Sequence, residues 1–93
     1  MQWKLFATLA EAAGESEVQV PVETEQPTLR DAFDSLLEHY PDLEAHVVDE
    51  DGSLHGHVQV LRNEHNPFND GDGWETTVSE GDELALLPPV SGG

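Results

Sequence analysis

The segment from residue 28 to residue 40 has the apolar periodicity of a long amphipathic helix. Its apolar side chains recur every three or four positions and form a single stripe: Leu29, Ala32, Phe33, Leu36, Leu37 and Tyr40. Thr28 can cap the first turn, Asp31 follows three positions later as in a capping box, and Pro41 ends the helix. We therefore predict one principal helix over residues 28–40, with its apolar stripe packed on a core.

Four shorter segments have the patterns of β-strands. They are residues 2–7, 18–22, 57–62 and 83–87. In the first segment, alternation places Trp3 and Leu5 on one face and Lys4 on the other. The second contains Pro21, which cannot donate to a ladder, so we expect that strand at an edge of the sheet. The last, ELALL, is almost continuously apolar, which is typical of a strand buried on both faces.

The interior position expected for the last strand determines the predicted sheet. Such a strand needs a neighbour on each side, and the N-terminal strand supplies one if it lies beside it in parallel. The first two strands would form an antiparallel pair, and the helix would cross one face. This is a β-grasp arrangement of the α+β class, with a mixed sheet of four or five strands. We predict a β-grasp domain over residues 1–87, followed by a flexible, extended tail over residues 88–93.

The connecting segments carry weaker patterns. We expect a short helical turn over residues 9–14, a short extended piece over residues 44–48 and a polar loop over residues 63–73. Trp74 and Val78 follow this loop, and we expect both to pack against the core.

The charge balance excludes several classes of function. The chain has 93 residues, with 3 basic and 20 acidic side chains, a net charge of −17 and no cysteine. Such a surface repels nucleic acid and anionic membranes. The lack of cysteine excludes disulfides and thiolate metal sites. No apolar run is long enough to cross a membrane, and the N-terminus does not read as a signal peptide, so we expect a soluble, cytoplasmic protein.

The scarcity of lysine refines the interpretation of this acidity. Lys4 is the only lysine, beside the two arginines Arg30 and Arg62. A surplus of carboxylates with almost no lysine predicts adaptation to molar salt, where screening removes their mutual repulsion. The alternative is an acidic protein from an ordinary environment that has a cationic partner.

No pattern typical of a catalytic centre is present. No serine lies in a nucleophile elbow, and the glycines near residue 72 lack the lysine and hydroxyl of a phosphate-binding loop. His55 and His57 would share one face of a strand, with Asp49 or Asp51 as a third metal ligand. Exposed histidines at a strand end are the simpler interpretation. The acidic loop before Trp74 also fails the EF-hand pattern, so we expect no metal site and no enzymatic activity.

The C-terminal segment favours a chemical role. Pro88 and Pro89 stop the last strand, and Val90, Ser91, Gly92 and Gly93 follow. Six extended residues reach about 20 Å. A Gly-Gly carboxylate can enter a narrow slot that any Cβ would block, as an enzyme activating that carboxylate would require. The alternative is a frayed terminus without a role.

Four segments together resemble a known family. They are GDELALLPPVSGG at residues 81–93, WKLFATLAEAAG at 3–14, TLRDA at 28–32 and VQVLRN at 58–63. The chain resembles the molybdopterin synthase small-subunit (MoaD-like) sulfur carriers, which are ubiquitin-like β-grasp proteins. Within that family it is most similar to the small archaeal modifier proteins of haloarchaea. The acidic loop at residues 66–75 departs from the family pattern.

The resemblance implies a mechanism based on the C-terminus. An E1-like enzyme would use ATP and Mg²⁺ to adenylate the Gly93 carboxylate, while the chain itself binds no cofactor. Sulfur transfer would then produce a thiocarboxylate for the large subunit of molybdopterin synthase or for tRNA thiolation. Alternatively, a lysine of a target protein would form an isopeptide bond with Gly93. The preceding tail residues would be recognised by the activating enzyme: Pro89, Val90, Ser91 and Gly92.

Two further expectations follow. As the only side-chain amine, Lys4 would be the acceptor if one copy of the chain were attached to another. A competing hypothesis is a non-covalent acidic adaptor or inhibitor that docks on a basic protein surface. An added residue after Gly93 would abolish the carrier function and leave the adaptor function intact.

Overall fold

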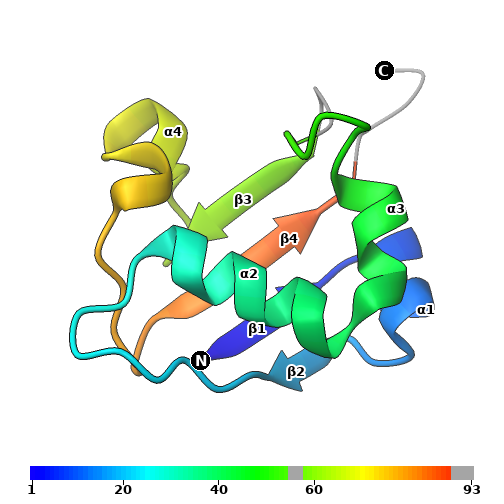
Figure 1. Ribbon diagram of the computed structural model, residues 1–93, viewed down its shortest axis with the longest axis horizontal. Helices are drawn as coiled ribbons and strands as arrows, with labels where there is room; N and C mark the ends of the chain where they lie inside the picture. The colour runs from blue at the N-terminus through cyan, green and yellow to red at the C-terminus, as the bar shows by residue number, and fades with distance from the viewer. Residues whose placement is uncertain (55–57, 89–93) are drawn as a thin grey trace.

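The computed structural model describes residues 1–54 and 58–88, which contain a four-stranded mixed sheet (Figure 1). The strands are β1 (Gln2–Leu5), β2 (Glu17–Gln19), β3 (Gln59–Arg62) and β4 (Glu83–Leu87). Their order is β2-β1-β4-β3. β1 runs parallel to β4, and the other two pairs are antiparallel. This confirms the predicted β-grasp arrangement, with the last strand in the interior and β2 at an edge.

The principal helix, α2 (Leu29–His39), lies across one face of the sheet (Figure 1). Thr28 Oγ1 accepts a hydrogen bond from the Asp31 N–H at 3.3 Å, and the Asp31 carboxylate accepts one from the Thr28 N–H at 3.0 Å. These two bonds are the predicted capping box. On the inner side of the helix, the Phe33 ring meets Trp3 of β1 edge-on, with ring centroids 6.3 Å apart.

One apolar core lies between α2 and the sheet. Its buried members are Trp3, Leu5, Leu9, Val18, Val20, Leu29, Ala32, Phe33, Leu36, Leu43, Val47, Val58, Val60, Val78, Leu84 and Leu86. Trp74 is half-buried, and its ring centroid lies 4.9 Å from that of Phe33. The predicted packing of Trp74 and Val78 against the core is therefore confirmed.

Residues 44–47 are helical, so the extended piece predicted over residues 44–48 is wrong except at Val48, which is extended and forms a β-bridge with Leu54. A 3-10 turn, η1 (Pro41–Leu43), leads directly into the short helix α3 (Glu44–Val47). Leu43 and Val47 are four positions apart, and both are completely buried. Their helical spacing lets this segment close one end of the core, and this packing overrides the strand preference of its two valines.

Other boundaries also differ from the prediction. β1 ends two residues early and is followed by the helix α1 (Thr8–Ala13), which confirms the expected helical turn. β2 is shorter than expected, although the backbone of Val20 still exchanges hydrogen bonds with Met1 at 2.7 and 2.9 Å. The predicted polar loop contains the helical turn α4 (Pro67–Asp70), and the turn η2 (Gly73–Glu75) begins at its last residue. Across the described ranges, every helix is too short or too polar to cross a membrane.

Candidate functional site

The C-terminal tail follows β4, which is an interior strand of the sheet. Leu84 and Leu86 are completely buried, and β4 pairs with β1 on one side and with β3 on the other. The strand ends at Leu87, and Pro88 is the last residue described. The predicted tail residues Pro89, Val90, Ser91, Gly92 and Gly93 lie outside the described part of the chain. Their roles and the domain boundary before residue 88 remain predictions.

Asp82 holds the turn that leads into β4. Its carboxylate accepts hydrogen bonds from Arg62 Nε at 2.9 Å, Asn63 Nδ2 at 3.1 Å and the Ser79 N–H at 2.8 Å. Asn63 Oδ1 in turn accepts a bond from the Glu83 N–H at 2.9 Å. Burial acts to raise the pKa of Asp82, but the bonds from Ser79, Asn63 and Arg62 outweigh it and lower that pKa. The start of β4 is thus tied to the end of β3, a role for Asp82 that the sequence analysis did not identify.

Lys4 lies on the face of the sheet opposite α2, as alternation predicts. Its Nζ forms an ion pair with Glu83 Oε1 at 2.5 Å, and the two side chains are 40% and 48% exposed. The hydrogen bond with Glu83, followed by the charge of Glu83, raises the pKa of Lys4 above its usual value. Glu17 and Glu64 act in the same direction. The amine is therefore accessible, and its carboxylate neighbours stabilise it in the protonated form.

An apolar strip runs beside Lys4 on the same face, which we call the open face. The register pairs Leu61 of β3 with Ala85 of β4, and Leu87 follows two positions after Ala85. Ala85 is 8% exposed, while Leu61 and Leu87 are half-buried. Phe6, directly after β1, is 44% exposed. These four residues form the open-face strip. The sequence analysis expected ELALL to be buried on both faces, but on the open face Leu87 is only half-buried.

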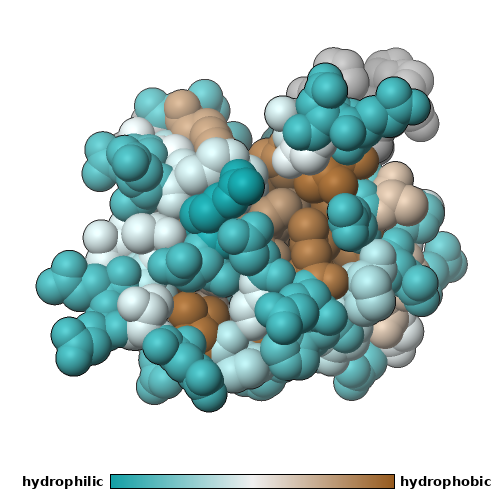
Figure 2. Space-filling view, viewed as in Figure 1, coloured by the Kyte–Doolittle hydropathy of each residue, from teal (hydrophilic) through white to brown (hydrophobic). Residues whose placement is uncertain are grey.

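The lysine and the two arginines are all paired within the chain. Lys4 pairs with Glu83, Arg62 with Asp82, and Arg30 with Asp34 at 3.5 Å. The Arg30 guanidinium also lies over the Trp74 ring, 5.5 Å from its centroid. The surplus charge of the surface is therefore negative. Figure 2 shows hydrophilic side chains spread over most of the face that carries α2, interrupted by an apolar area near the centre.

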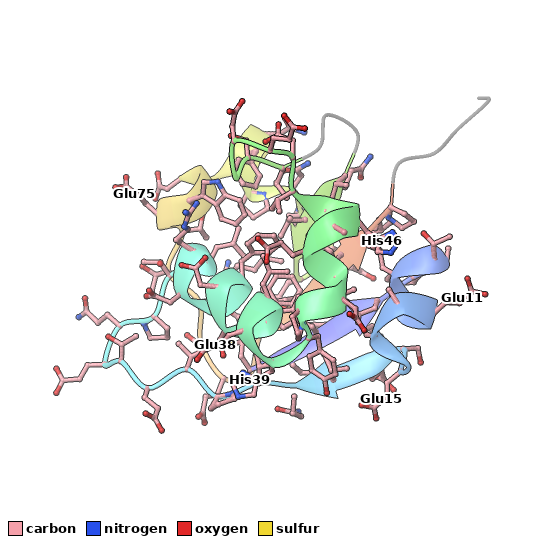
Figure 3. All side chains as sticks on the ribbon, turned by 45° about the vertical axis from the view of Figure 1, so that its right-hand side comes forward. Glu11, Glu15, Glu38, His39, His46 and Glu75 are labelled. Atoms are coloured by element: carbon pink, nitrogen blue, oxygen red, sulfur yellow. The ribbon has the colours of Figure 1, made fainter. Side chains whose placement is uncertain are left out.

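The surplus carboxylates are spread over the surface. Figure 3 shows labelled carboxylates on several elements, including Glu11 on α1, Glu38 on α2 and Glu75 on η2. Within residues 1–54 and 58–88, no three histidine, aspartate or glutamate side chains are grouped so as to hold a metal ion. The His55 and His57 pair lies outside those ranges.

Comparisons with known proteins agree with this architecture. The model of the ThiS family matches residues 3–93. Small archaeal modifier protein 1 of Haloferax volcanii is 46% identical over 93 residues, covering the whole of both chains. Small archaeal modifier protein 3 of the same organism is 32% identical, covering all of this chain and 98% of that protein. A crystal structure of the first of these proteins superimposes with a TM-score of 0.87, over 100% of this chain and 98% of the other.

Proposed function

We propose, from the premise that this chain belongs to the ThiS family of ubiquitin-like sulfur carriers and small modifiers, that it acts through the carboxylate of Gly93. The observation that supports this most strongly is the origin of the tail. The tail follows β4, the interior strand that Asp82 ties to β3. A partner that docks on the domain must reach the terminal carboxylate. The start of the tail therefore has to lie at a fixed position relative to the docking surface.

The proposed chemistry has two steps. An E1-like enzyme binds ATP and Mg²⁺, and the Gly93 carboxylate attacks the α-phosphorus, so that pyrophosphate leaves and an acyl adenylate forms. Hydrosulfide then attacks the acyl carbon, the bond to AMP breaks, and a thiocarboxylate remains as the donor for molybdopterin synthase or for tRNA thiolation. When the nucleophile is a lysine amine of a target protein, the same displacement forms an isopeptide bond. The chain supplies the electrophile, and the partner supplies the catalysis.

The open-face strip is the surface on which we expect the activating enzyme to dock. It contains exposed apolar area, mainly at Phe6, and it reaches Leu87, where the tail begins. Lys4 and Glu83 beside it form an ion pair, and Glu17 and Glu64 add negative charge near Lys4. An apolar patch is the part of a highly acidic surface that a partner can cover with the least desolvation of charge.

Deletion of Gly92 and Gly93 tests the proposed function. The two residues carry no side chains, so we expect the free energy of unfolding to change by no more than about 0.5 kcal/mol. Thiocarboxylate formation and conjugation should both be lost, measured by intact-mass spectrometry in cells that lack the native copy. A Glu25→Gln variant, which changes one exposed side chain outside the tail and the open-face strip, is the control. Restoration of either activity by the truncated chain would refute the proposal, since only a non-covalent adaptor tolerates that change.

Lys4 is the acceptor that we propose for attachment of one copy to another. Lys4→Arg keeps a cation opposite Glu83 and removes the nucleophilic amine, so the fold should be unaffected. We expect side-chain-linked chains of this protein to disappear, while its attachment to other targets continues. Peptide mapping of the conjugates measures both. Chains linked through a side chain of the Lys4→Arg variant would contradict the assignment.

A further inference from the structure

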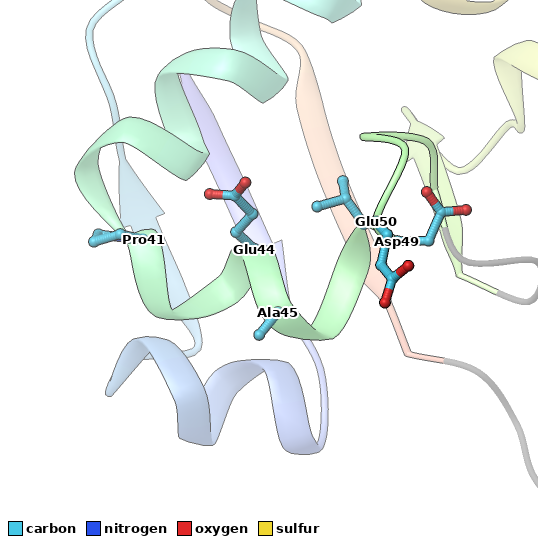
Figure 4. Close-up of a pocket in the computed structure, with 6 residues that line it drawn as sticks. Pro41, Glu44, Ala45, Asp49 and Glu50 are labelled. Carbon is cyan, nitrogen blue, oxygen red and sulfur yellow. The ribbon is translucent and has the colours of Figure 1, made fainter.

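A shallow hollow opens on the outer side of α3 and of the turn that follows it. It encloses about 580 Å³ and is lined by Pro41, Glu44, Ala45, Val48, Asp49 and Glu50 (Figure 4). Three of these residues are apolar, with Pro41 and Ala45 exposed and Val48 half-buried, and we call them the apolar floor of this open hollow. The other three are exposed carboxylates that form an acidic rim.

The backbone around the hollow is well ordered by local bonds. The Val48 N–H donates to the Glu44 carbonyl at 3.0 Å and ends α3. Asp49 Oδ1 accepts bonds from the Asp51 N–H at 2.9 Å and the Ser53 N–H at 3.1 Å. One carboxylate oxygen of Asp49 therefore orients the side chain, and the other remains available to a ligand. Asp49, one of the three carboxylates of the rim, is therefore oriented by the fold.

The lysine and arginine side chains of this chain all lie in ion pairs away from the rim. Lys4, Arg30 and Arg62 each pair with a carboxylate that does not line the hollow. The occupant that complements an apolar floor inside an acidic rim is a lysine or arginine side chain. Its methylene stem can cover Ala45 and Val48 while its charged end meets the rim.

The position of the hollow relates it to the tail. Figures 1 and 4 both show α3 beside the end of β4, where the tail begins. The six residues from Pro88 to Gly93 reach about 20 Å when extended. A protein segment bound in the hollow would therefore have its neighbouring residues within the range of the Gly93 carbonyl.

We infer that the α3 hollow binds a basic side chain of the target protein, next to the lysine that receives Gly93. The inference rests on the proposed conjugation function and specifies the substrate class. Acceptor lysines would lie within about six residues of a second lysine or arginine, because an extended segment of that length spans the same 20 Å. The acidic rim then selects the segment, and the tail modifies it.

Peptide binding tests the hollow without relying on conjugation. The probe is Ac-Gly-Lys-Leu-Lys-Gly-NH₂ in 1 M KCl, where the Debye length is about 3 Å and only contact pairs persist. We expect the amide signals of Ala45 and Val48 to shift in NMR spectra. The triple variant Glu44→Gln, Asp49→Asn, Glu50→Gln should weaken binding at least fivefold. The Asp49→Asn change should leave the turn folded, because an amide oxygen still accepts the bonds from the Asp51 and Ser53 N–H groups.

A matched variant separates the hollow from general charge attraction. Glu25→Gln, Glu75→Gln, Glu80→Gln removes the same three charges from exposed residues that do not line the hollow, and binding should change by less than twofold. Ala45→Arg, which fills the hollow and keeps every carboxylate, should block the probe. Equal weakening by the two triple variants, or shifts confined to other surfaces, would overturn the inference. The proposed function is tested separately. It fails if the protein without substitutions forms neither a thiocarboxylate nor conjugates.

Discussion

Asp82 shows how one side chain can determine the geometry of the tail. It is 12% exposed and receives hydrogen bonds from two side chains and one backbone N–H. Two of its partners, Arg62 and Asn63, belong to the end of β3 and the turn after it. The carboxylate thus joins two segments about twenty positions apart and fixes the point at which β4 begins.

Replacing Asp82 with alanine should therefore destabilise the fold. We expect the free energy of unfolding to fall by about 2 kcal/mol at pH 7, because Arg62, Asn63 and the Ser79 N–H lose a charged acceptor. The pKa of Asp82 is lowered in the folded state, so its contribution is present above the unfolded pKa of about 3.9. It is lost as the pH falls through the folded value. Urea unfolding should show a difference between the two proteins that shrinks below about pH 4, and a difference independent of pH would refute this account.

At the scale of elements, the turn between β1 and α1 depends on an unusual backbone conformation. Ala7 has φ 52° and ψ −125°, which is rarely adopted by a residue with a Cβ. Ala7 precedes the first residue of α1, whose Leu9 is completely buried in the core. This conformation is strained, and the packing of the neighbouring elements compensates for its energetic cost.

Ala7→Gly should relieve this strain. We expect the variant to be more stable by about 1 kcal/mol, since glycine adopts positive φ without steric cost. The same change at Ala12, inside α1, should lower stability by about 0.5 to 1 kcal/mol, because glycine costs conformational entropy within a helix. Thermal unfolding of both variants measures the contrast. Destabilisation of similar size at the two positions would show that Ala7 is not strained.

At the scale of the whole molecule, the surplus of negative charge dominates. The net charge is −17 on a chain with a radius of gyration of 12.3 Å. At 0.1 M salt the Debye length is about 10 Å, so repulsion extends across most of the protein. The lysine and the two arginines are already paired and cannot relieve it.

Monovalent salt should therefore stabilise the protein. We expect the melting temperature at fixed pH to rise between about 0.1 and 2 M KCl, because screening removes repulsion among carboxylates. Calorimetric scans at the two concentrations measure the change. Equal melting temperatures would contradict the electrostatic account. Stabilisation by sulfate alone would indicate exclusion of the salt from the surface.

Much of this architecture is determined by local patterns in the sequence. The 3.6-residue period over residues 28–40 predicts α2 with its cap, and the apolar run at residues 83–87 predicts an interior strand. The interior strand then leads to the β-grasp order without further information. Alternation also places Lys4 correctly on the open face. These predictions succeed because the period of the side chains within one element decides which face is buried.

The tertiary structure alone decided the features that join distant segments. The pair of Lys4 with Glu83, the bonds of Asp82 to Arg62 and Asn63, and the open-face strip all bring together residues from different strands. The helix α3 also depends on the tertiary structure, although its residues are consecutive in the sequence. Four residues cannot sustain a helix by themselves, because nucleation costs more than so few hydrogen bonds return. The burial of Leu43 and Val47 against the rest of the core stabilises it, and that contact exists only after the chain has folded.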